Sequence, residues 1–99
     1  MTADEFRAST AAPRCPEGLP PALVGLWHDA RGDWEVAHRV VQDAGDRDSA
    51  WVHAYLHRKE GDLWNAGYWY GRAGRVQAGG SVAQEWVSIV AALCERGEA

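Results

Sequence analysis

An internal repeat is the feature that most limits what this chain can fold into. Residues 22–50 and 51–79 align with an offset of 29 residues. The positions identical in both copies are His28/His57, Gly32/Gly61, Asp33/Asp62, Ala37/Ala66, Ala44/Ala73 and Gly45/Gly74. Such a repeat is typical of proteins in which similar units stack, because one unit cannot bury its apolar face alone. The repeat therefore predicts a stack of similar elements.

The spacing of apolar residues predicts that these elements are helices. Apolar residues recur at intervals of three and four residues in five segments. These segments cover about residues 21–31, 34–43, 50–60 and 63–73, and the chain from residue 81 onward. Gly-Asp at 32–33 and at 61–62 suits a turn, since Gly ends one helix and Asp caps the next. We expect an all-α, five-helix, repeat-like array of two antiparallel helix pairs and a C-terminal capping helix.

The two ends of the chain differ in apolar content. Residues 1–20 carry few large apolar side chains and no helical periodicity beyond a short turn. We expect a flexible N-terminal tail there and a helical-repeat domain over residues 21–97. The chain has 99 residues and six tryptophans. This length allows at most one domain, and its small core would depend on dense packing of aromatic side chains and alanines.

Composition and motifs disfavour several classes of function. The net charge is −4 and no long basic run occurs, which argues against nucleic-acid binding. No apolar run approaches the roughly 20 residues of a membrane span, and no signal peptide is visible. Cys15 and Cys94 form no CxxC pair, so we expect free thiols and a cytoplasmic protein. No phosphate-binding loop or nucleophile motif is present, and we expect neither catalytic residues nor a cofactor.

The second copy of the repeat resembles the tetratricopeptide repeat, a helix-turn-helix unit with small residues at fixed positions. The matching residues are Ala54, Gly61, Asp62, Ala66, Tyr70 and Ala73. In the first copy they are Gly25, Gly32, Asp33, Ala37 and Ala44. The unit is shorter than the family's usual length of about 34 residues. It also lacks the closing proline, and His28 and His57 stand where the family has a tyrosine.

The resemblance implies a non-catalytic module that binds a protein or peptide on a concave face formed by the first helix of each pair. In the second copy it implies that this face is lined by Trp51, Tyr55, Arg58 and Lys59. We add Trp64 as an anchor for a partner, because it begins a helix at a position that the motif leaves exposed. Two repeats are fewer than the usual three, so homodimerisation would supply further burial.

The histidines have two interpretations. His53 and His57 are four residues apart on one helix face, and Glu60 follows on the same stripe. Two imidazoles and a carboxylate can form an open metal site, which makes a small metal- or ligand-binding protein the alternative function. In the other interpretation, which we favour on sequence alone, His28 and His57 are hydrogen-bonded core residues. We expect His38, which has no counterpart in the other copy, to lie partly exposed.

Overall fold

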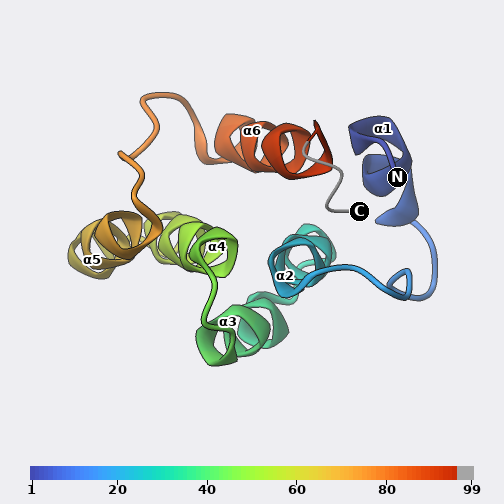
Figure 1. The fold of residues 1–99 in the computed structure, drawn as a ribbon, viewed down its shortest axis with the longest axis horizontal. Helices are drawn as coiled ribbons and strands as arrows, with labels where there is room; N and C mark the ends of the chain where they lie inside the picture. The colour runs from blue at the N-terminus through green and yellow to red at the C-terminus, as the bar shows by residue number, and fades with distance from the viewer. Residues whose placement is uncertain (96–99) are drawn as a thin grey trace.

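The computed structural model describes residues 1–95, which form six helices and no strand. In chain order the helices are α1 (Ala3–Ser9), α2 (Pro21–Ala30), α3 (Trp34–Asp43), α4 (Arg47–Lys59), α5 (Leu63–Ala73) and α6 (Val82–Glu95), as Figure 1 shows. The all-α prediction is confirmed, with one helix more than expected. The predicted end of the domain at residue 97 lies outside the described residues.

The two Gly-Asp turns form as their chemistry predicts. Gly32 and Gly61 adopt φ values of 80° and 87°, in the left-handed region that favours glycine. The carboxylates of Asp33 and Asp62 then accept the backbone N–H three residues later, each at 3.2 Å, and so begin α3 and α5. These local signals join α2 to α3 and α4 to α5 as two helical hairpins.

Helix α4 begins earlier than the apolar spacing predicts. We expected its first residue near position 50, but the helix begins at Arg47. Its N-cap is Asp46, whose carboxylate accepts the backbone N–H of Ser49 at 3.0 Å and the Ser49 hydroxyl at 2.7 Å. The added turn is polar, so the hydrophobic pattern does not reveal it.

Helix α4 is the centre of the molecule, because it packs against α2, α3, α5 and α6. Small residues line the seams of the hairpins: Ala37, Ala54 and Ala66 are fully buried. Gly25 lies where α2 packs on α3, and a Cβ there would stand only 2.7 Å from a methyl group of Val41. Small side chains therefore set how near the helices come to one another.

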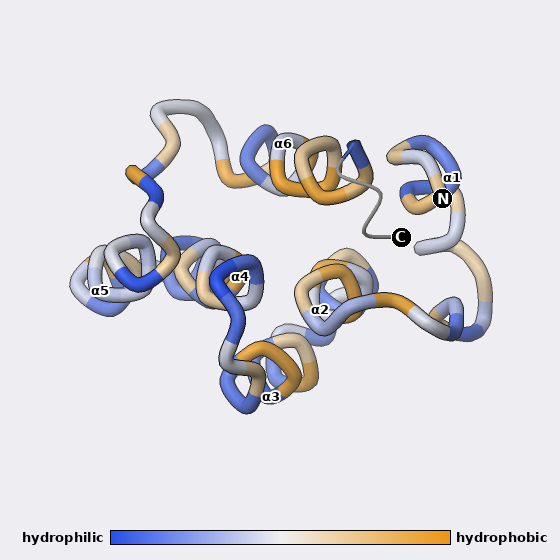
Figure 2. The backbone as a smooth tube through the Cα atoms, in the orientation of Figure 1, coloured by the Kyte–Doolittle hydropathy of each residue, from blue (hydrophilic) through white to orange (hydrophobic). Residues whose placement is uncertain are grey.

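Helix α6 turns back over the first helices of the two hairpins. It packs against α1, α2 and α4, and within the described chain it makes no close backbone contact with α5 (Figure 1). Its hydrophobic residues face α2 and α4 (Figure 2), with Ile89, Val90 and Leu93 buried. The Trp86 indole N–H donates to the Leu26 carbonyl at 3.1 Å. Helix α6 therefore covers the face on which we expected a partner to bind.

The N-terminal segment differs from the flexible tail expected over residues 1–20. Thr2 and Glu5 form a capping box that begins α1. Phe6 has no exposed surface, and its ring centroid lies 6.0 Å from that of Trp86 on α6. The Trp27 indole N–H donates to the Ser9 carbonyl at 3.1 Å. The Arg31 guanidinium also donates to the carbonyls of Thr10 and Ala12, just after the helix. One buried aromatic ring and these long-range hydrogen bonds hold the segment, and none of them has a signature in local periodicity.

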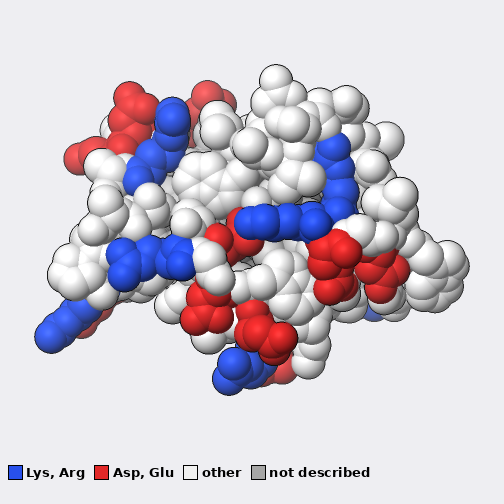
Figure 3. All heavy atoms as spheres, turned by 180° about the vertical axis from the view of Figure 1, so that it is seen from behind, with Lys and Arg blue, Asp and Glu red and all other residues white. Residues whose placement is uncertain are grey.

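The surface shows no broad area of one charge on the face seen in Figure 3, where acidic and basic side chains are interspersed. Among residues 1–95, no helix combines the length and the apolar character that a membrane crossing requires.

Candidate functional site

Three histidines from two helices meet at the seam between α3 and α4. His53 and His57 lie one turn apart on α4, and His38 reaches them from α3. The Nε2 atoms of His38 and His53 are 3.0 Å apart. One ring nitrogen from each of the three histidines lies within 4.8 Å of the other two. The seam therefore gathers three imidazoles around one point.

Two tryptophans form walls around this histidine cluster. The Trp34 ring stacks on His38 with a centroid distance of 4.8 Å, and the Trp69 ring stacks on His53 at 3.9 Å. The Trp34 indole N–H donates to the Leu56 carbonyl at 2.9 Å, which fixes its ring. The stacked indoles limit the rotation of both imidazoles and exclude water from two sides of the cluster.

A carboxylate orients the third imidazole. Glu60 Oε1 lies 2.7 Å from His57 Nδ1. In metalloproteins a carboxylate commonly holds one ring nitrogen of a ligating histidine, which leaves the other nitrogen to the ion. Asp62 is close to both residues, but its two oxygens accept from the backbone and side chain of Asn65 at the start of α5. Glu60 is therefore the supporting carboxylate of this site.

His53 is buried without its full set of hydrogen bonds. It is 2% exposed, and its Nδ1 has no hydrogen-bond partner within residues 1–95. Burial, together with the charges that His38 and His57 would carry, lowers the pKa of His53 to about 4. Burial also lowers the pKa of His38. Both imidazoles are thus neutral at pH 7, the form that binds metal ions.

The cluster suits a borderline transition-metal ion better than magnesium or calcium. Imidazole nitrogens are preferred ligands of zinc, copper and nickel, whereas the hard cations prefer oxygen. Two nitrogens bound tetrahedrally to zinc at about 2.0–2.1 Å stand about 3.3 Å apart. The 3.0 Å between the Nε2 atoms of His38 and His53 is close to that distance. The His57 nitrogen lies within 4.8 Å of theirs, so the His57 side chain would have to move closer to bind the same ion.

The sequence prediction for this site had two of the three imidazoles. His53 and His57 lie together as their spacing on α4 predicts, while Glu60 contacts His57 from outside the cluster. The third imidazole is His38, for which we expected no role. Its meeting with α4 depends on how two helices pack, which no spacing within one helix reveals. His28 lies outside the cluster, half-buried, with its ring edge-on to Trp27 at 5.1 Å.

Three of the five predicted partner-binding residues are engaged inside the molecule. Trp51 is 8% exposed beneath the guanidinium of Arg75, which lies 3.7 Å from its ring centroid. Tyr55 is 2% exposed. Arg58 donates to the buried carboxylate of Glu85 at 2.9 Å. The surface that we expected these side chains to form for a partner is covered, because α6 packs on the same side of α4.

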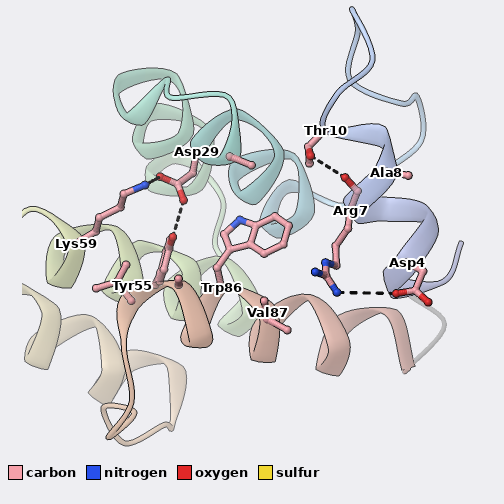
Figure 4. Close-up of a pocket in the computed structure, with 12 residues that line it drawn as sticks. Asp4, Arg7, Ala8, Thr10, Asp29, Tyr55, Lys59, Trp86 and Val87 are labelled. Atoms are coloured by element: carbon pink, nitrogen blue, oxygen red, sulfur yellow. Dashed lines mark hydrogen bonds and ion pairs between the residues drawn. The ribbon is translucent and has the colours of Figure 1, made fainter.

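The other two predicted partner-binding residues reach solvent. Trp64 is 80% exposed. Lys59 borders an open groove of about 1080 Å³ between α1, α2, α4 and α6. There its amine donates to Asp29 at 2.8 Å, and the Tyr55 hydroxyl donates to the same carboxylate at 2.6 Å (Figure 4). Across the groove, Arg7 approaches from α1 and the Trp86 ring forms part of the wall.

No protein-family model, no curated protein and no solved structure matches the chain. The resemblance to the tetratricopeptide repeat therefore stays a prediction.

Proposed function

We propose that this chain binds a divalent transition-metal ion, zinc above all, through His38, His53 and His57. The observation that carries the proposal is the convergence of three imidazoles on one point, with the His53 ring nearly fully buried. Burying such a group without a hydrogen bond is costly. A core that needed only apolar bodies at these positions would be more stable with leucine or phenylalanine. Metal ligation would account for the presence of histidine at all three positions.

The proposed role of the ion is to join the two hairpins. His38 belongs to the hairpin α2–α3, and His53 and His57 belong to the hairpin α4–α5. An ion held by all three would cross-link the hairpins at the side opposite to α6. Because the ion binds the folded chain, a free ion concentration of about 100 times Kd raises the free energy of unfolding by about 2.7 kcal/mol.

Calorimetric titration of chelator-treated protein with zinc tests the proposal. We expect one zinc ion per chain and a rise in melting temperature on addition of zinc. His38→Ala, His53→Ala and His57→Ala should each weaken zinc binding at least tenfold. Glu60→Gln should weaken it by about 10- to 100-fold through the orientation of His57. Circular dichroism of each variant checks that the helices remain, and His38→Gln offers a milder change at the least buried of the three.

His28→Ala is the matched control, because His28 is half-buried but lies outside the histidine cluster. It should bind zinc like the parent. The proposal fails if folded parent protein binds no zinc at micromolar concentration, or if the His28 variant loses as much affinity as the cluster variants.

Protein or peptide binding stays a prediction. The residues expected to carry it are largely buried. Of the face on which we expected a partner to bind, the groove bordered by Lys59 and Trp86 remains open. We rank this function below metal binding, because the groove's two buried polar groups, Asp29 and Tyr55, already satisfy each other.

A further inference from the structure

Helix α5 presents an apolar face that nothing in the described chain covers. Among residues 1–95, α4 is the one helix whose backbone lies close to α5, and the buried Tyr70 hydroxyl of α5 also donates to Glu85 on α6. On its outer side Leu63, Trp64 and Tyr68 are 59%, 80% and 50% exposed. Most of the strongly exposed large apolar side chains of the molecule lie in or directly after this helix. In a helical stack the next element would cover this face, but α6 leaves it and packs on α1, α2 and α4 instead.

Two glycines on the same helix are not required by any contact among residues 1–95. Gly67 and Gly71 lie inside α5, where glycine is less favourable than alanine. Neither adopts a positive φ. Within residues 1–95, a Cβ added at either position would meet no atom within 4 Å beyond its own helix backbone, so the described fold does not require glycine there. The two glycines would instead allow another molecule to pack closely against α5.

The bulky aromatic rings and the glycine positions on this face are arranged so that the rings of one copy fit against the glycines of another. Trp64, Gly67, Tyr68 and Gly71 recur at helical intervals of three and four and so share one side of α5. A two-fold axis passing between positions 67 and 68 sets Trp64 opposite Gly71 of a second copy, and Tyr68 opposite Gly67. Each aromatic ring then meets a position without a side chain, as a self-complementary interface requires.

The charges of α5 favour the same antiparallel arrangement. Asp62 caps the start of the helix, and Arg72 lies in its last turn. Arg72 belongs to the exposed face, since its guanidinium donates to the Tyr68 hydroxyl at 3.0 Å. Antiparallel pairing brings each basic end beside the acidic end of the other copy, and opposes the two helix dipoles, whereas parallel pairing would set like ends together.

We propose that the α5 face formed by Trp64, Gly67, Tyr68 and Gly71 binds the same face of a second copy of this chain in an antiparallel, two-fold pair. The aromatic rings act as anchors and the glycines allow the two helices to approach closely. A single helix face makes a small interface, so the dimer should depend on concentration in the micromolar range. This inference does not rest on the metal site, although the Trp69 ring lies between the two: it stacks on His53 at 3.9 Å and its centroid is 5.2 Å from that of Tyr68.

Sedimentation velocity of the parent protein, from about 1 to 500 μM, tests the proposal. We expect a monomer–dimer equilibrium. Trp64→Glu and Gly71→Leu should each weaken dimerisation at least tenfold. The Gly71→Leu variant separates loss of pairing from loss of folding, because leucine favours an exposed helix and should leave the monomer's melting temperature equal or higher.

Val87→Glu and Ala83→Leu are the matched controls, since both positions are exposed on α6, away from α5. They should dimerise like the parent. A parent that stays monomeric at 500 μM overturns the proposal. A dimer that persists in both α5 variants also overturns it. So does a dimer that the α6 control substitutions weaken as much as the α5 substitutions do, because its interface would then lie outside the α5 face.

Discussion

At the scale of single residues, His53 combines nearly complete burial with a group that titrates near neutral pH. Its ring lies between Trp69 and two other imidazoles. Burial disfavours the charged ring and lowers its pKa to about 4. In the unfolded chain the pKa of a histidine is about 6.5. Between these values the unfolded chain binds more protons than the folded one.

Metal-free protein should therefore lose stability as the pH falls from about 6.5 to about 4. The unfolded state gains the proton first, so the free energy of unfolding is fully present above pH 6.5 and decreases below it. We expect His53 to account for a loss of about 2 kcal/mol. Urea denaturation at pH 7.5, 5.5 and 4.5, with chelator present, measures this loss.

The matched comparison is His53→Phe, which keeps a flat ring beside Trp69 but cannot bind a proton. Acidic residues give both proteins a common pH dependence, so the difference between their slopes reports His53 alone. Equal slopes would contradict the prediction. At this scale the sequence predicted that His53 and His57 share a face, because that follows from helix geometry. It could not predict that His38 completes the cluster or that His53 is the most buried of the three.

At the scale of helices, close packing of α2 on α3 depends on Gly25. This was predictable, because the repeat aligns Gly25 with Ala54 and both are small. The two Gly-Asp turns were predictable for a similar reason, since cap and turn chemistry act within a few residues. Helix α1 and the placement of α6 were not, because the contact of Phe6 with Trp86 joins segments 80 residues apart. Local pattern carries no information about such a pair.

The same substitution should have opposite effects in α2 and α5. Gly25→Ala puts a methyl group 2.7 Å from Val41 Cγ1, so Val41 or the helix must shift. We expect a net loss of about 1 kcal/mol, because overpacking exceeds the gain in helix propensity. Gly67→Ala meets open space and should stabilise the dilute monomer by about 0.5–1 kcal/mol. Thermal melts of both variants at low micromolar concentration check the difference, and a Gly25 variant that gains as much as the Gly67 variant would show that the seam is loose.

At the scale of the whole molecule, one buried carboxylate joins α6 to both α4 and α5. Glu85 is 2% exposed. Its oxygens accept from Arg58 at 2.9 Å and from the Tyr70 hydroxyl at 2.7 and 2.8 Å. Arg58 also donates to the Gly80 carbonyl before α6. Burial and the Glu85 carboxylate raise the pKa of Tyr70 above its usual range, so Tyr70 remains a donor. This network holds the returning helix in place over the core.

Removing only the carboxylate should therefore loosen α6. Glu85→Ala leaves the largely buried Arg58 cation without its counter-charge and the Tyr70 hydroxyl without an acceptor, at a cost of about 3–5 kcal/mol. That is a large share of the roughly 5–15 kcal/mol that stabilises a small domain. Hydrogen exchange should show protection lost in residues 82–95 before it is lost in α4.

The double variant Arg58→Met/Glu85→Leu separates the contribution of the ion pair to stability from that of side-chain packing at the same two positions. It removes both ions and fills their space with apolar atoms, so it should cost much less than Glu85→Ala alone. If Glu85→Ala instead melts like the parent, α6 is held by Ile89, Val90 and Leu93 alone. If the double variant is as unstable as the single one, the ion pair itself supplies net stability. We expect the parent and the double variant to have similar stabilities and Glu85→Ala to be far less stable. This order follows because an unpaired buried cation destabilises the fold more than the absence of both ions does.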